Sequence, residues 1–243
     1  MKSTTTLVAI IAALIVLAFM YYVVNLNLEV DRTFLSISTF IFSIFTGFFI
    51  SRQASRFNKV RETVTAFDGK LSSIYRSSGH ISAALQAEIG VIITAHYRLI
   101  LKTEKWNIHF VQPSNTLTNL HALLEHHIVE KDVTKLSNQA IGAIVKSLAA
   151  CQDIRKQMIA YYEERIPQEQ WVLIIFFSLI LIGTVSAIDS TGVLFTSILK
   201  AAFVVSVLSV LLILYRLNNL VYSEDIMGQH SAEDVLGIIS GKR

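Results

Sequence analysis

The chain has 243 residues, of which 53% are hydrophobic and only 16% charged, and its mean hydropathy is +0.53. Soluble domains have about 25% charged residues, so this composition favours a membrane protein. The formal net charge of +3 is too small to indicate a nucleic-acid partner, and the single cysteine, Cys151, excludes an intrachain disulfide.

Four long apolar segments can each cross the hydrocarbon core of a membrane, which is about 30 Å thick. They occupy residues 7–24, 33–50, 171–188 and 193–215. The first segment is longer than the apolar part of a secretory signal peptide and does not end in small residues, so we interpret it as a span. Short polar turns join the first two segments and the last two, and each pair therefore forms a membrane hairpin.

Basic residues next to the spans predict the orientation of the chain. They lie mainly at the span ends that face the central region: Arg52, Arg56, Lys59, Arg61, Arg155, Lys156, Arg165 and Arg216. The two short turns contain a single cation, Arg32. Because flanking Lys and Arg stay on the cytoplasmic side, we expect a multi-pass protein of the cell membrane with both termini and the central region in the cytoplasm.

The central region, residues 51–167, is predicted to be a bundle of helices. The first helix continues the second span to about Tyr75 and breaks at residues 77–79. A helix at residues 80–101 follows; it is apolar enough for a re-entrant or fifth spanning segment, but its charged residues favour a buried core helix.

Two further helices are predicted beyond a connection at residues 104–115. They cover residues 116–130 and 132–165, and Pro167 is expected to bend or break the chain before the third span. The fold class is therefore all-α, with four transmembrane helices in two hairpins and a central cytoplasmic bundle. The predicted divisions are residues 1–50, 51–167, 168–216 and a cytoplasmic tail at 217–243.

Short motifs flank the central region. Ser-Arg-Phe at residues 55–57 follows the second span, and Ile-Pro at 166–167 follows an Arg-containing helix and precedes Trp171. Together with the span order and the size of the cytoplasmic insert, these motifs resemble the bestrophin-like family of bacterial four-span membrane proteins. The family usually has an Asp followed by Pro-Phe after the fourth span, whereas this chain has Leu-Asn-Asn-Leu-Val at 217–221.

The resemblance implies a ring of subunits, a pentamer in true bestrophins, around a pore lined by the second span. It also implies ion transport across a cell membrane, the inner membrane in bacteria. Bestrophins conduct chiefly anions, and bacterial relatives can prefer cations. Copies of the chain, membrane lipid and inorganic ions are therefore the expected partners, and no cofactor is expected.

Small and hydroxyl residues of the second span share one sector of a helix, at 100° per residue. One interpretation is that they line an aqueous path, with Phe40 and Ile50 as hydrophobic constrictions. The alternative is close helix packing, which small residues also permit. The candidate pore-lining residues are Ser36, Thr39, Phe40, Ser43, Thr46, Gly47 and Ile50.

Charged residues at the two span ends leave selectivity open. Glu29 and Asp31 in the outer turn would favour cations, whereas Arg52 and Arg56 at the inner end would favour anions if they face the axis. Membrane anchoring is the alternative role of these arginines. Lys200 is the single charge inside a span and is expected to reach the outer surface along its aliphatic stem.

The histidines do not match a metal-binding motif. His121, Glu125, His126 and His127 share one predicted helix, but the His-Glu-x-x-His pattern of zinc hydrolases is absent. No set of acid, base and nucleophile is visible, which disfavours an enzyme. Two hypotheses remain: an oligomeric ion channel, with anion conduction slightly favoured, or a non-conducting scaffold or sensor that binds a cytoplasmic partner through its helical domain.

Overall fold

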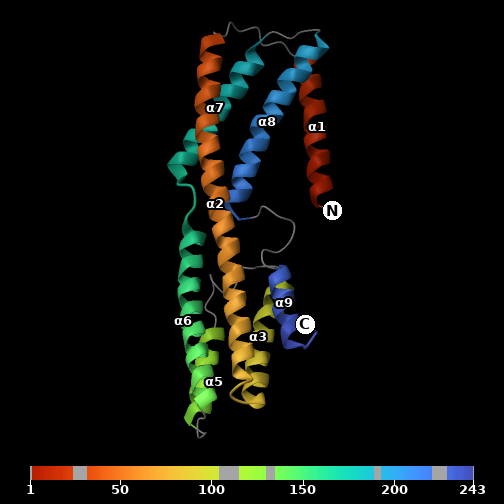
Figure 1. The fold of residues 1–243 in the computed structure, drawn as a ribbon. Coiled ribbons are helices and arrows are strands. Elements are labelled where there is room, and N and C mark those ends of the chain that lie inside the picture. Colours follow the sequence, from red (N-terminus) through yellow and green to blue (C-terminus); the bar gives the residue numbers. More distant parts are fainter. Residues whose placement is uncertain are drawn as a thin grey trace. The chain divides into compact units, whose positions relative to one another are not determined.

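The computed structural model describes residues 2–23, 32–103, 115–129, 135–188, 193–220 and 229–242. Every regular element in these ranges is an α-helix, as the sequence predicts (Figure 1). The chain divides into two compact units: residues 1–57 with 165–224, and residues 58–164 with 225–243.

The first unit contains the most apolar helices. They are α1 (Lys2–Val23), the first part of α2 (Arg32–Ser78), α7 (Gln168–Ala187) and α8 (Leu194–Asn218). Helix α8 packs against both α1 and α7 (Figure 1). Phe42 of α2, Leu181 of α7 and Val207 of α8 form a buried cluster that joins these three helices.

The predicted break at Pro167 is confirmed. Helix α6 ends at Glu163 and α7 begins at Gln168, directly after Pro167 with φ −56° and ψ 151°. Proline has no N–H to donate, so it fits at a helix start, where that donor would have no intrahelical partner.

The second unit is a helical bundle. It contains the rest of α2 with α3 (Ala83–Thr103), α5 (Thr116–Val129), α6 (Lys135–Glu163) and α9 (Gln229–Ile239). Helix α3 packs against α5 and α9, and α5 packs against α6. The bundle encloses apolar side chains spaced three or four residues apart: Leu71, Ile74, Leu85, Ile89, Ile93, Leu120, Ile144, Leu148 and Met158.

The predicted elements of this unit agree with the structure apart from α9. Helix α2 continues without interruption from the span to Ser78, where the predicted break occurs. The predicted connection at residues 104–115 falls almost wholly outside the described residues. The sequence did not predict α9, because it is short and lies in a polar tail.

Length and composition qualify four described helices as membrane spans, and three of them match the prediction. These three are α2, α7 and α8; the fourth is α3 rather than α1, whose described apolar part, Ile11–Val23, is shorter. Helix α3 is the least apolar of the four, and its exposed face has Glu88, Arg98 and Lys102.

The packing of α6 predicts unequal effects of one substitution at two sites. Leu148→Ala removes a side chain that is 0% exposed, and we expect the free energy of unfolding to fall by about 2–5 kcal/mol. Leu136→Ala, on the same helix at 60% exposure, is the matched control and should have little effect. Denaturant titration in detergent, followed by circular dichroism, measures both; equal losses would contradict the described core.

Candidate pore-lining face

Helix α2 has one face covered by the other helices of its unit. Ser38, Phe42 and Phe49 are buried there, at helical spacing, and Gln53 and Arg56 continue the same face. Phe49 packs with Ile166, Ile174 and Leu214 in a second apolar cluster. These contacts determine how α2 is rotated about its axis.

Among the described residues, no other helix covers the opposite face of α2. Ser36, Phe40, Ser43 and Gly47 are all exposed and share one sector of the helix. Phe40 is 65% exposed, and a Cβ atom added to Gly47 would meet no atom of another helix within 4 Å. Ser51 is also exposed at the next turn and was not among the predicted residues.

Hydroxyl groups along this segment donate to the carbonyl four residues earlier. Thr39 Oγ1 donates to Leu35 O at 2.8 Å, Ser43 Oγ to Thr39 O at 2.8 Å, and Thr46 Oγ1 to Phe42 O at 2.7 Å. Each hydroxyl proton is thereby satisfied without water. The oxygen of exposed Ser43 keeps lone pairs that can accept from water or a neighbouring chain.

The remaining predicted residues do not lie on the uncovered face. Thr46 is buried, Thr39 is half-buried, and Ile50 packs against the cluster that contains Phe49. The predicted stripe therefore divides: four residues are exposed together, and three lie at its covered edge. Of the predicted mouth charges, Arg52 is exposed, while Glu29 and Asp31 lie outside the described residues.

Arg56 belongs to a buried hydrogen-bond cluster at one end of the first unit. It is 3% exposed, and its Nη1 donates to Asn218 O at 2.9 Å and to Gln53 Oε1 at 3.0 Å. Asn218 Oδ1 accepts the Ile166 N–H at 2.8 Å. The cluster joins α2, the last residue of α8 and the segment before α7. Sequence analysis missed it, although an Asn directly after a span was the available signal.

Lys200 is buried rather than exposed at the outer surface, so the expectation that it reaches the surface is wrong. Its Nζ donates to Ile188 O at the end of α7 and lies 5.5 Å from the centre of the Tyr21 ring. The Tyr21 hydroxyl is in turn hydrogen-bonded to Ser186 at 2.6 Å. A cation is favourable at a helix C-terminus, and here it links α1, α7 and α8.

The histidines of α5 lie in different surroundings. His121 Nε2 is 3.5 Å from Gln152 Nε2, and His127 Nε2 is 4.0 Å from Glu88 Oε1, while Glu125 and His126 are exposed. Within the described residues, no three potential ligand side chains are grouped as a metal would require. These residues are therefore no basis for a metal-dependent function.

Comparison with known families identifies one match. The family model of the Bestrophin-like domain matches residues 6–220. Neither the curated proteins nor the solved structures gave a match. The matched range includes the uncovered face of α2 and the Arg56 cluster, whereas α9 lies beyond it.

The Arg56 cluster predicts that alanine substitutions at two adjacent asparagines lower the free energy of unfolding by different amounts. Asn218→Ala leaves the Ile166 N–H without its acceptor, and we expect a loss of about 1–3 kcal/mol in the free energy of unfolding. Asn219→Ala removes only an exposed bond to Tyr215 O and should cost much less. Melting temperatures of both variants in detergent provide the comparison. Equal stability of the two variants would mean that the cluster contributes nothing.

Proposed function

The chain belongs to the bestrophin-like family, and on that basis we propose that copies of this membrane protein form a ring around an ion pore lined by the uncovered face of α2. Five copies are the number that the family resemblance implies. Each copy would contribute one α2 to the pore wall, and the second unit would form a vestibule in the cytoplasm.

The observation that carries this proposal is the polarity of the uncovered face. In hydrocarbon, large apolar side chains are favoured, yet Ser36, Ser43 and Gly47 occupy exposed positions on α2. Hydroxyl oxygens and exposed backbone at a glycine suit water or close contact with another copy. In a ring with this face at its axis, the hydroxyl oxygens meet water and the backbone at Gly47 can lie close to a neighbouring copy.

The proposed topology uses α1, α2, α7 and α8 as spans and assigns α3 to the cytoplasmic bundle. Helix α3 would expose Glu88, Arg98 and Lys102 to lipid if it crossed the membrane, and such charges are costly there. Basic residues beside the spans support a cytoplasmic location for both termini.

Anion conduction is the favoured ion class. The preference for anions rests on the family resemblance, since bestrophins conduct chiefly anions; Arg52 is exposed but lies one turn after Phe48, outside the sector of Phe40, so a ring of Arg52 side chains does not support it. Arg56 does not supply a cation to the pore mouth either, because its guanidinium is buried and donates to Gln53 and Asn218. Phe40 is the large apolar side chain on the uncovered face and would form the constriction.

The first test of the pore compares two exposed phenylalanines of α2. We expect Phe40→Ala to widen the constriction and raise single-channel conductance at least about twofold, because a ring of apolar side chains limits the passage of water and ions. Phe48→Ala is the matched control, since Phe48 is 59% exposed but lies outside the sector of Phe40. Planar bilayer recordings under a chloride salt gradient give both the conductance and, from the reversal potential, the ion class.

Labelling with charged thiol reagents gives a second test of the aqueous path. In a Cys151→Ala background, Ser43→Cys should become blocked by a membrane-impermeant methanethiosulfonate, whereas Phe176→Cys, exposed on α7, should be unaffected. Native mass spectrometry verifies that each variant still assembles. Block at both positions, or at neither in a conducting protein, would place the pore elsewhere.

Partner binding by the second unit is a second candidate, favoured by a specific observation. Val91 and Leu99 on α3 are exposed, and a groove of about 510 Å³ runs past Gly90, Thr94 and Ile239. An exposed apolar patch of this kind is typical of a protein-binding surface. An assembled protein that stays silent in every recording would favour this function over conduction.

A further inference from the structure

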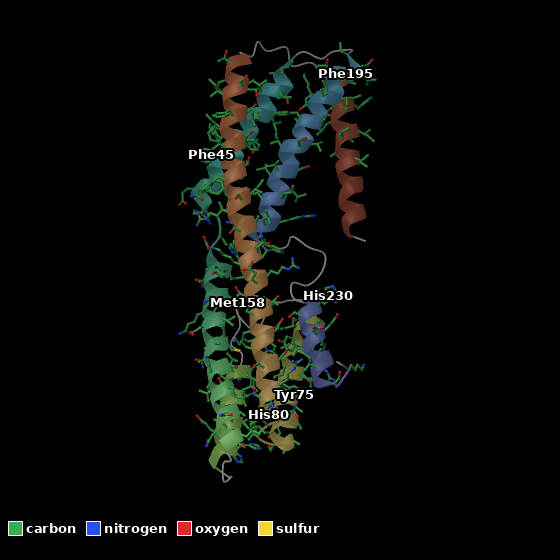
Figure 2. All side chains as sticks on the ribbon, viewed as in Figure 1. Phe45, Tyr75, His80, Met158, Phe195 and His230 are labelled. Atoms are coloured by element: carbon green, nitrogen blue, oxygen red, sulfur yellow. The ribbon has the colours of Figure 1, made fainter. Side chains whose placement is uncertain are left out.

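The C-terminal helix α9 docks on the second unit through a small apolar and polar interface. Ala232 and Val235 are its buried residues, and the Tyr75 hydroxyl donates to Ile239 O at 3.3 Å. Figure 2 shows Tyr75 beside the last turn of α9 and His230 in its first turn. Because α9 lies outside the family match, its role is not implied by the family.

A carboxyl group lies beneath this helix. Asp68 of α2 is 4% exposed, and its Oδ1 accepts a hydrogen bond from the Tyr97 hydroxyl at 2.6 Å. Its Oδ2 is buried, and no donor among the described residues forms a hydrogen bond of ordinary geometry with it. The Ser231 hydroxyl, from the first turn of α9, lies near enough to the carboxyl to influence its pKa. Thus α9 helps to bury a group whose charge is incompletely compensated.

We propose that Asp68 makes the docking of α9 dependent on pH, so that a protonated carboxyl favours the docked helix and an ionised carboxyl favours its release. A buried carboxylate with one oxygen lacking a hydrogen bond opposes burial. Protonation removes this charge and with it the cost of burial. The released state exposes Asp68 to water, where its charge is solvated.

The pKa of Asp68 gives the direction and range of this dependence. Burial raises the pKa from its ordinary value of 3.8 to about 6, against the smaller lowering effects of the nearby Ser231 hydroxyl and of the hydrogen bond from Tyr97. The docked state therefore binds the proton more tightly than the released state. Docking is weakest above pH 6 and strengthens as the pH falls toward 4, by up to about a hundredfold in the docking equilibrium constant.

Several other titratable groups lie near Asp68 and must be considered as sources of the pH dependence. On α3, Tyr97 donates to it, and His96 stacks edge-on against the Tyr97 ring at 5.1 Å. On α6, burial raises the pKa of the Cys151 thiol to about 12, so this thiol is neutral throughout the relevant range. Lys70 lies on the same helix as Asp68, and its positive charge lowers the pKa of the Cys151 thiol. On α9 itself, His230 Nδ1 lies 3.8 Å from Glu233 Oε2, so His96 and His230 are the two neighbouring histidines that the test must separate from Asp68.

Amide hydrogen exchange of the full chain in lipid nanodiscs tests the proposal. Protection factors for the peptide that covers α9, corrected for the intrinsic pH dependence of exchange, should be about ten times higher at about pH 5 than at about pH 7.5. In Asp68→Asn, which is close in shape and permanently neutral, protection should be high and independent of pH. Constant protection in the wild-type chain would overturn the proposal, as would a remaining pH dependence in Asp68→Asn, since another group, such as His96 or His230 of α9 itself, would then be its source.

Two further variants keep the result interpretable. Ser231→Ala removes a hydroxyl that stabilises the carboxylate, so the midpoint of the transition should move to higher pH. Asp153→Asn, at an exposed site on α6, should keep the wild-type profile. If Ser231→Ala leaves the midpoint unchanged, or Asp153→Asn shifts it as Asp68→Asn does, the assignment to Asp68 is wrong. These readouts do not require ion conduction, so they remain valid if the pore proposal fails.

Discussion

A buried guanidinium at the end of two spans is the interaction on which the first unit depends. The last carbonyls of a helix have no intrahelical donors, and Arg56 supplies one to Asn218 at the end of α8. The side chain of Asn218 then accepts the Ile166 N–H just before α7 begins. These two hydrogen bonds join α2, α8 and the start of α7, and they pair the Asn218 carbonyl and the Ile166 N–H, which would otherwise lack partners. With α2 held at this point, its apolar side packs inward and its small residues remain uncovered.

Most of the fold could be predicted from the sequence, since the strongest signals are local ones. Long apolar segments, apolar residues at helical spacing and the proline at position 167 correctly predicted the helices between residues 32 and 218. The two criteria disagree for α1 and α3: length and composition of the described residues qualify α3 and not α1, whereas the charges on the exposed face of α3 favour a place outside the membrane. Helix α9 was missed because it is short and its contacts are long-range: it packs against α3, and the Tyr75 hydroxyl donates to Ile239 O.

The candidate site was predicted less completely. A helical projection grouped Ser36, Ser43 and Gly47, which are exposed together on α2, with Thr46, which is buried on the covered side next to Phe42 and Phe49. A projection gives angles and does not show where a neighbouring helix begins to cover the surface. The two inner arginines illustrate the same limit. Arg52 and Arg56 have the same charge and lie one turn apart, yet one is exposed and the other is buried between helices.

The open space around Gly47 has a consequence for how this sequence can vary. Within one chain, nothing beyond its own helix would obstruct a larger residue at this position. Natural variation there is therefore restrained by helix propensity and by whatever lies outside the chain, and not by the fold of the monomer. If homologues prefer glycine at this position, the reason would therefore lie in contacts between subunits or in the diameter of a pore, because the fold of the monomer does not require glycine there.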